Sequence, residues 1–414
     1  MCSSDLAATL RGVAAETPLT PHPRWSAATG ARVFVKREDL QPVRSYKLRG
    51  AFNLMSQLGP AERAAGVVCA SAGNHGQGVA WSCARLGVPG QVYVPTTTPR
   101  QKRDRIIALG QGQVELVVRG ETYDGAADAA AAGAAASGRV LVPAFDDLRT
   151  LAGQGTVVRE VFTQLGQAPD VFIVPVGGGG LYDGCGAWLR THYPGTAVVG
   201  VEPAGAACLA AALAAGRPVS LERVDTFVDG AAVRRAGDLT TPLAAAVGGR
   251  LLAVPEGQVC SEMLEMYQVD GIIAEPAGAL AASVLRTGPH DVSLAVAPGQ
   301  TVVVVISGGN NDISRYSEVL ERSLVHEGRK HYLMVSFPQE PGALRRFLDD
   351  ILGPDDDIVL FEYVKKSNRE AGPALVGVEL GDPDDFPALL ARAAASPLQV
   401  EVIDPDSSFY HYLV

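Results

Sequence analysis

Lys47 is the residue of this sequence whose setting most favours covalent chemistry. The apolar stripe of an amphipathic helix follows it, at Leu48, Ala51, Phe52 and Met55. Ser45 stands at the expected N-cap of this helix, and Gly59-Pro60 should end it. The field at a helix N-terminus favours the neutral form of an amine, which is the form that attacks a carbonyl group. Because a first-turn lysine is more often a solvated surface residue, its interpretation depends on the rest of the chain.

Three glycine-rich loops each follow a predicted strand, and we expect each to open a helix. They are Ser71-Ala72-Gly73-Asn74-His75-Gly76-Gln77-Gly78, Gly177-Gly178-Gly179-Gly180-Leu181 and Ser307-Gly308-Gly309-Asn310-Asn311-Asp312. The free N–H groups of the first loop suit a carboxylate, and the four glycines of the second allow close approach by a phosphate. Asn74 could donate to a hydroxyl or oxyanion, whereas His75 is either a general base or, more commonly for such a histidine, a structural residue. The second loop fits neither a Walker loop nor a dinucleotide fingerprint.

The elements that must position these residues alternate between strands and helices, which predicts a parallel sheet covered on both faces. The predicted strands are 33–40 (running into a polar turn), 66–70, 92–94, 114–118, 171–174, 198–201 and 301–306. The predicted helices are 6–13, the Lys47 helix, 79–86 ending at Gly87, 99–110, 122–137, 204–215, 258–267 and 277–285. We expect residues 1–325 to form one catalytic domain of two α/β lobes, the smaller at about 50–145. Loops at the carboxyl ends of parallel strands share one crevice, so a reactive lysine, a phosphate cup and a carboxylate cup predict a pyridoxal-phosphate enzyme acting on an amino acid.

Residues 326–414 follow a different pattern, strand-helix-strand-strand-helix-strand, which is the ferredoxin-like order. The predicted strands are 330–337, 358–363, 374–380 and 400–403, with a turn at Pro341-Gly342 and a polar loop at 365–373. The first helix carries Leu344, Phe347, Leu348 and Ile351 on one face, and the second carries Phe386, Leu389, Leu390 and Ala393. This arrangement predicts a separate binding domain, and the alternative is an added structural or oligomerisation lobe.

Composition excludes several classes of protein. A net charge of −10 without a basic cluster argues against nucleic-acid binding, and no apolar run reaches the roughly 18 residues of a membrane span. The N-terminus shows no signal-peptide pattern, so we expect a cytoplasmic protein. The six cysteines form no zinc-site spacing, which predicts free thiols and no metal site. They are Cys2, Cys69, Cys83, Cys185, Cys208 and Cys260.

From about residue 17 to 405 the sequence resembles the fold-type II pyridoxal-phosphate enzymes (tryptophan synthase β-like), and most of all the threonine dehydratases, or threonine ammonia-lyases. The resemblance rests on Ser45-Tyr46-Lys47-Leu48-Arg49-Gly50, the three glycine-rich loops, Phe145-Asp146-Asp147, Ala152-Gly153-Gln154-Gly155-Thr156 and Ala274-Glu275-Pro276-Ala277-Gly278-Ala279. Many relatives carry Phe at the position of Tyr46, a change we expect to be harmless. The run Phe337 to Leu344 resembles the ACT-like regulatory domain of the shorter biosynthetic enzymes.

The resemblance implies a role for each matching position. Lys47 would form a Schiff base with the cofactor, pyridoxal 5'-phosphate, and later move the Cα proton of the substrate. Asn74 would bond the 3′-oxygen of the cofactor, and the amides of Gly177, Gly178, Gly179, Gly180 and Leu181 would hold its phosphate. Ser307 would face the pyridine nitrogen; because a hydroxyl cannot protonate the ring, prompt β-elimination would be favoured over transamination. Ser71, Ala72, Gly73, Asn74 and His75 would bind the substrate carboxylate.

The implied activity is deamination of L-threonine to 2-oxobutanoate and ammonia in isoleucine biosynthesis, with L-serine as a possible second substrate. Isoleucine would bind residues 330–405 and inhibit, valine would oppose it, and the enzyme would be a homo-oligomer, a dimer or tetramer. The alternatives on the same fold are a catabolic serine/threonine dehydratase, a serine racemase and a non-catalytic amino-acid sensor. The first two usually lack such a C-terminal module, and Lys47 beside Asn74 argues against the third.

Overall fold

The computed structural model describes residues 3–363, 370–404, 407 and 409–413. Its chain divides into two units. The first comprises Met1–Glu256, Glu265–Thr287 and Asp291–Asp312, and the second comprises Gly257–Leu264, Gly288–His290 and Ile313–Val414. The domain boundary between residues 325 and 326 stays a prediction. Within the described part of the chain, no helix is long and apolar enough to cross a membrane.

A six-stranded sheet forms the larger lobe of the first unit, in the order β1-β2-β10-β7-β8-β9. Its strands are β1 (Leu19–Pro21), β2 (Arg32–Arg37), β10 (Thr301–Ile306), β7 (Val171–Pro175), β8 (Ala197–Pro203) and β9 (Arg250–Val254). All neighbouring strands are parallel except β1, which runs antiparallel to β2. Every residue of β7 and β10 is buried, as expected for central strands covered on both faces. Strands β1 and β9, and the two-residue strand β6 (Val140–Leu141) of the smaller lobe, were not predicted from the sequence.

Helices cover the two faces of this sheet. Alternate residues of β7 and β10, such as Phe172 and Val303, pack in one core with the helices α9, α10, α11 and α12. These helices are α9 (Thr156–Leu165), α10 (Gly180–His192), α11 (Cys208–Ala215) and α12 (Thr240–Val247). Helix α14 (Pro276–Ser283) packs on β10, β7 and β8 and is wholly buried.

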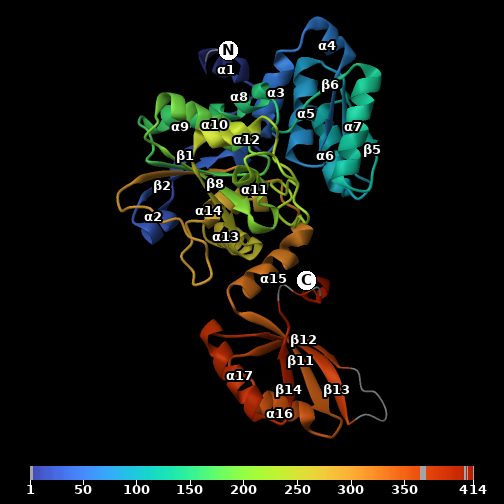
Figure 1. The fold of residues 1–414 in the computed structure, drawn as a ribbon, viewed down its shortest axis with the longest axis vertical. Coiled ribbons are helices and arrows are strands. Elements are labelled where there is room, and N and C mark those ends of the chain that lie inside the picture. Colours follow the sequence, from blue (N-terminus) through green and yellow to red (C-terminus); the bar gives the residue numbers. More distant parts are fainter. Residues whose placement is uncertain (1–2, 364–369, 405–406, 408, 414) are drawn as a thin grey trace. The chain divides into compact units, whose positions relative to one another are not determined.

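A parallel four-stranded sheet, in the order β5-β4-β3-β6, forms the smaller lobe. Its strands are β3 (Val67–Ala70), β4 (Gly90–Val94), β5 (Val114–Val118) and β6 (Val140–Leu141). On one face, Cys69 and Val92 pack with α3 (Lys47–Ser56), α5 (Asn74–Leu86) and α6 (Arg100–Gly110). On the other face, Val68 and Tyr93 pack against α7 (Tyr123–Ser137). Figure 1 shows this sheet with α5, α6 and α7 around it.

Several predicted boundaries were wrong in detail. Helix α1 (Ser3–Leu10) ends before Val13, and residues 204–206 form a 3-10 turn, so that α11 begins only at Cys208. Helix α3 ends at Ser56, and Gly59 instead precedes a short helix, α4 (Pro60–Ala65), with the proline at its first position. The remaining helices of the first unit are α2 (Pro23–Thr29) and α8 (Leu148–Gln154), with 3-10 turns at Glu38–Leu40 and Ala204–Ala206. Helix α13 (Glu256–Gln268) is divided between the units, with Gly257–Leu264 in the second.

The second unit contains the predicted ferredoxin-like arrangement, an antiparallel sheet in the order β12-β13-β11-β14. Its elements are α15 (Tyr316–His326), β11 (Lys330–Pro338), α16 (Ala343–Asp350), β12 (Asp357–Tyr363), β13 (Ala371–Glu379), α17 (Phe386–Ala395), β14 (Gln399–Val402) and α18 (Tyr410–Leu413), with 3-10 turns at Ile313–Arg315 and Pro383–Asp385. Phe347 and Ile351 are buried in its core, whereas Leu344 and Leu348 are 42% and 43% exposed. Of the predicted polar loop, residues 364–369 lie outside the described residues, and 371–373 belong to β13.

The cysteine prediction holds for the five described cysteines, which are buried and free; Cys2 lies outside the described residues. Among the described residues there is no cluster of His, Cys, Asp and Glu that could hold a metal ion.

Candidate active site

Lys47 is the first residue of α3, as predicted, but its cap differs from the prediction. The N-cap is Tyr46, which has helical φ and ψ angles and makes no side-chain capping bond, so assigning Ser45 to this position was wrong. The Ser45 hydroxyl instead accepts from the Lys47 amide at 3.3 Å. The Lys47 amine donates only a long bond, 3.4 Å to the carbonyl of Ala144, and lies 5.3 Å from the centre of the Tyr46 ring. Burial lowers the pKa of this amine to about 8, and the nearby Glu275 carboxylate partly opposes the effect.

The third glycine-rich loop holds the backbone just before Lys47. The Tyr46 amide donates to the Ser307 carbonyl at 3.1 Å, and the Gly309 amide donates to the Arg44 carbonyl at 2.9 Å. Arg44 has a φ of 56°, an unusual conformation for a residue with a Cβ, and these contacts maintain it. Contrary to the prediction, this loop leads into a 3-10 turn rather than directly into an α-helix.

Asn74, at the start of α5, is held by two residues that the sequence analysis did not single out. Its side-chain nitrogen donates to Glu275 at 2.5 Å, and its side-chain oxygen accepts from Asn310 at 2.7 Å. Asn310 also donates to the Val43 carbonyl at 2.8 Å. The amide group of Asn74 is therefore fixed in orientation, with one N–H left for another acceptor. The only signal for Glu275 in the sequence was its place in the segment 274–279, one of the motifs that resemble the threonine dehydratases.

Glu275 carries the carboxyl group whose charge acts on the Lys47 amine. Burial raises its pKa to about 7, with the Asp229 carboxylate adding to the rise. Asp229 forms an ion pair with Lys102 of α6, 2.7 Å between nitrogen and oxygen, which joins the two lobes of the first unit beside the crevice. At neutral pH a small change in charge around Glu275 therefore changes its ionisation, and with it the charge state of Lys47.

We expect Glu275→Gln to lower the pKa of Lys47 by roughly one unit, because the substitution removes the nearby negative charge that raises it. The measurement is the pH dependence of the rate at which apoenzyme develops visible absorbance with added pyridoxal phosphate. Glu121→Gln, at an exposed position, is the matched control. An unchanged midpoint in Glu275→Gln would show that Glu275 does not act on the amine.

His75 is 3% exposed, and its Nε2 lies 2.8 Å from the Val142 carbonyl oxygen. Because a carbonyl can only accept, this nitrogen carries the proton and Nδ1 is the unprotonated one. Burial, with the charge of Lys47, lowers the pKa of His75 to about 4. A base of this strength is a poor proton acceptor at neutral pH, which favours the structural interpretation over the general base. The neighbouring Ser71 hydroxyl accepts from the Gly73 amide at 3.2 Å and closes the turn before α5.

The tetraglycine loop joins β7 to α10 and presents the N-terminal amides of that helix. Gly179 has a φ of 97°, which a residue with a Cβ rarely adopts. At Gly178 a Cβ would lie 2.5 Å from the Phe145 ring, so only glycine fits there. The backbone amides at the start of this 13-residue helix form a cup for an anion.

Ser307, at the end of β10, is 3% exposed, and its hydroxyl donates to the Ala277 carbonyl at 3.1 Å. The oxygen keeps lone pairs but its proton is engaged, so in this arrangement the hydroxyl can accept from a partner. A carboxylate is absent at this position, as the sequence analysis anticipated.

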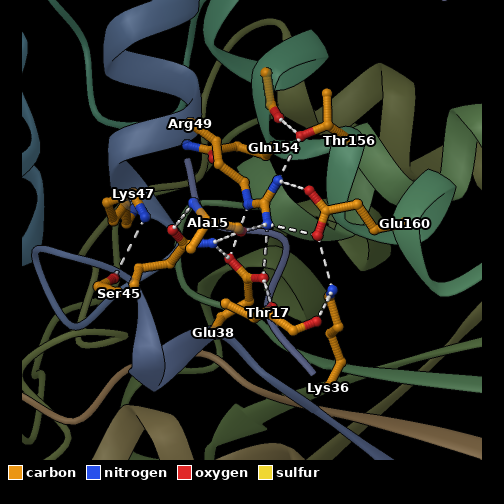
Figure 2. A network of polar contacts seen from close by, with 12 residues as sticks. Ala15, Thr17, Lys36, Glu38, Ser45, Lys47, Arg49, Gln154, Thr156 and Glu160 are labelled. Carbon is orange, nitrogen blue, oxygen red and sulfur yellow. Dashed lines mark hydrogen bonds and ion pairs between the residues drawn. The ribbon is translucent and has the colours of Figure 1, made fainter. Parts of the chain in front are cut away.

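A buried network of charges anchors the helix that carries Lys47 (Figure 2). The guanidinium of Arg49, wholly buried, makes two bonds of 2.8 Å to Glu38 and bonds of 2.6 and 2.9 Å to Glu160. Lys36 of β2 donates to Glu160 at 2.7 Å and to the Thr17 carbonyl at 2.6 Å. The network therefore joins α3 to the 3-10 turn after β2 and to α9.

These side chains together can hold a ligand that carries both a carbonyl group and a phosphate. A lysine amine with a lowered pKa can condense with the carbonyl, and the glycine cup can receive the anion. The first loop and the fixed Asn74 lie beside the Lys47 helix. The backbone of Lys47 and Leu48 is so close to Gly78 that a Cβ at this glycine would lie only 3.1–3.2 Å from their backbone atoms.

Comparison with protein families gives two matches. Residues 10–308 match the family described as pyridoxal-phosphate dependent enzyme. Residues 321–413 match the C-terminal regulatory domain of threonine dehydratase.

The individual proteins that this chain resembles belong to the same families. The biosynthetic L-threonine dehydratase of Mycobacterium tuberculosis is 60% identical over 404 residues, which covers 97% of this chain and 93% of that protein. The corresponding protein of Bacillus subtilis is 44% identical over 405 residues, covering 98% and 95% of the two chains. Among solved structures, threonine deaminase isoform 2 of Solanum lycopersicum is 36% identical, with a TM-score of 0.71 over 77% of this chain and 92% of that one. Maize serine racemase also has a TM-score of 0.71, at 26% identity over 78% and 97% of the chains. The chain therefore belongs to the pyridoxal-phosphate-dependent enzymes and, within them, to the family of the biosynthetic L-threonine dehydratases.

Proposed function

We propose that this enzyme deaminates L-threonine to 2-oxobutanoate and ammonia by eliminating the β-hydroxyl group. The observation that supports this function most is the Lys47 amine, with its pKa lowered to about 8, at the start of α3 in a protein of this family. In the reaction the Cα–H and Cβ–O bonds break and water leaves. Hydrolysis of the resulting carbon–nitrogen bond then consumes one water and releases ammonia, so the atoms balance.

The residues of the site fit the cofactor of the family. When bound, pyridoxal phosphate supplies an aldehyde for covalent attachment and a ring that accepts the electrons of the Cα–H bond. Lys47 holds that aldehyde and later moves the Cα proton, and a pKa near neutrality suits an amine that must give and take a proton. The amides from Gly177 to Leu181 bind the phosphate, and Asn74, oriented by Glu275 and Asn310, bonds the 3′-oxygen.

Two further groups complete the proposed site. Ser307 would face the pyridine nitrogen; its hydroxyl, which donates to the Ala277 carbonyl in this structure, would turn to donate to that nitrogen, and it is too weak an acid to protonate it. This arrangement limits how far electrons delocalise into the ring and favours loss of the β-hydroxyl. The loop from Ser71 to His75, at the N-terminus of α5, binds the substrate carboxylate through its amides.

The direct test is release of 2-oxobutanoate from L-threonine by the purified holoenzyme, followed with lactate dehydrogenase and NADH. We expect turnover with L-threonine and slower turnover with L-serine. Formation of D-serine from L-serine without keto-acid release would instead support a racemase, the alternative that the maize structure brings into consideration. The match of residues 321–413 to a threonine dehydratase regulatory domain favours the deaminase.

The same proposal includes regulation. Residues 1–325 form the catalytic domain and 326–414 the regulatory one, in a cytoplasmic homo-oligomer; isoleucine binds the regulatory domain and inhibits, and valine opposes it. The ferredoxin-like fold of the second unit supports an effector site there.

We expect L-isoleucine to reduce threonine turnover by about 5–150-fold, the usual range of allosteric coupling. Activity curves of the full-length enzyme at increasing L-isoleucine, with and without L-valine, measure this effect. D-isoleucine, with the same composition and hydrophobicity, is the matched control. Threonine turnover unchanged at saturating L-isoleucine would contradict feedback control.

A further inference from the structure

Asp183 is a buried carboxyl group that no described residue satisfies. Its side chain is 0% exposed, and neither of its oxygen atoms has a hydrogen-bond partner among the described residues. Buried carboxyl groups are normally paired or hydrogen-bonded, because desolvation without compensation costs several kcal/mol. The position of Asp183 makes this exception informative: it lies in the first turn of α10, and its amide donates to the Gly179 carbonyl at 2.8 Å.

The unpaired carboxyl group points to the tetraglycine loop. One oxygen of Asp183 lies 3.2 Å from the position that a Cβ of Gly179 would occupy. Thr240, the first residue of α12, lies against the same position, with its hydroxyl oxygen 3.3 Å away. A buried acid and a buried threonine therefore lie against the third glycine of the cup.

Burial and the charges around Asp183 determine whether its carboxyl group is protonated. Burial raises its pKa to about 8, and the charge of Asp146 raises it further in the same sense. Asp146, in the loop before α8, accepts from the amides of Asp238, Leu239 and Thr240 at 2.9–3.3 Å. On the α12 side the remaining charges are the exposed Arg235–Asp238 pair. On α10 itself, Tyr182 interacts electrostatically with Asp183.

A carboxylate beside a phosphate cup would repel the anion that the cup receives, whereas a carboxylic acid can donate to it. An acid has one O–H donor, and a phosphate oxygen accepts hydrogen bonds strongly. We propose that Asp183 is held as the neutral acid and donates a hydrogen bond to the phosphate group of the bound cofactor, so that phosphate binding and protonation of Asp183 are coupled. This inference rests on the proposed role of the tetraglycine loop and adds a donor to it.

The coupling has a sign that can be measured. Phosphate prefers the protein with Asp183 protonated, so above the pKa of Asp183 binding must take up one proton and affinity must fall. The limiting slope is about tenfold in affinity for each pH unit. Below that pH the acid is already protonated, and the contribution of Asp183 to phosphate affinity no longer depends on pH.

The experiment compares two ligands that cannot condense with Lys47, pyridoxine 5'-phosphate and pyridoxine, on full-length apoenzyme by calorimetric titration from pH 7 to 9.5. The ratio of their dissociation constants isolates the phosphate. In the wild type we expect this preference to fall about tenfold for each pH unit above about 8. In Asp183→Asn, whose amide is a permanent neutral donor, the part of the slope due to Asp183 should disappear. Any part due to Lys47 remains in both proteins. Asp238→Asn, which changes an exposed carboxylate at the start of α12, is the matched control.

The outcomes separate the two proposals. A steep slope in the wild type that persists in Asp183→Asn overturns the role of Asp183 and leaves the phosphate cup in place. Equal affinities for the two ligands at pH 7 would overturn the phosphate cup, and the role of Asp183 with it. If Asp183→Asn does not fold, the same titration of Lys47→Met, which lacks the amine that could also take up a proton, decides near pH 9 in buffers of different ionisation enthalpy: uptake of close to one proton with pyridoxine 5'-phosphate beyond that with pyridoxine supports the proposal, and equal uptake rejects it.

Discussion

Lys47→Ala is expected to abolish the visible absorbance of the bound cofactor and to reduce 2-oxobutanoate release by at least the 10²–10⁴-fold that a positioned proton-transfer group contributes. The loss of covalent attachment adds to this factor, so the residual rate should be close to background. The physical reason is the position of the Lys47 amine, which donates to the carbonyl of Ala144; the next residue, Phe145, packs against Gly178 and Gly180 of the tetraglycine loop. The measurements are an absorbance spectrum of the dialysed protein and a keto-acid assay with L-threonine.

Two comparisons distinguish chemistry from a folding defect. Lys47→Arg keeps the positive charge but cannot form the covalent bond, so it should be as inactive as Lys47→Ala. Added ethylamine should restore part of the turnover in Lys47→Ala, where the substitution leaves space, and none in Lys47→Arg. Threonine turnover retained in both variants without added amine would remove Lys47 from the mechanism.

Arg49→Met is expected to lower the free energy of unfolding of the first unit by about 3–5 kcal/mol, the cost of breaking a buried ion pair by removing one partner. The substitution leaves Glu38 wholly buried without its cation, and Glu160 with Lys36 alone. Arg100→Met is the matched control, because Arg100 and Asp104 form an exposed pair that should contribute less than about 1 kcal/mol. The chain's three tryptophans, Trp25, Trp81 and Trp188, all lie in the first unit, so urea unfolding followed by tryptophan fluorescence reports on that unit.

The pH dependence of this effect follows from Glu38. Burial raises the pKa of Glu38, but the Arg49 guanidinium, together with Lys36 and the Thr17 hydroxyl, outweighs burial and holds this pKa below its usual range. A carboxyl group with a lowered pKa stabilises the folded state above its unfolded pKa, about 4.3, and loses this contribution as the pH falls through the folded value. The difference between wild type and Arg49→Met should therefore be largest near pH 7 and shrink below about pH 4. A difference that is constant over this range would indicate that packing, rather than charge, is lost.

Local patterns in the sequence were sufficient for most elements. The apolar spacing after Lys47 predicted α3, the runs of β-branched residues predicted β7, β8 and β10, and the order of patterns after residue 326 predicted the ferredoxin-like sheet. These signals can be read from the sequence because hydrophobic periodicity and composition are properties of short segments. The boundaries at Ser45, Gly59 and Ala204 were wrong because caps and short turns depend on bonds of single groups. The strands β1, β6 and β9 were missed; all three are edge strands, which are defined by their pairing more than by their composition.

The parts of this protein are readable in its sequence: a lysine at a helix start, glycine-rich loops after strands, and an added regulatory fold. Which distant groups surround those parts depends on the tertiary structure. Glu275 reaches Asn74 across 201 residues, Arg49 reaches Glu160 across 111, and Asp183 meets the charge of Asp146 beside Gly179. The physical reason is that pKa values and buried ion pairs depend on distance and desolvation in space, which no local spacing encodes. The lysine is visible in the sequence, but the charges that set its pKa are brought to it by the fold.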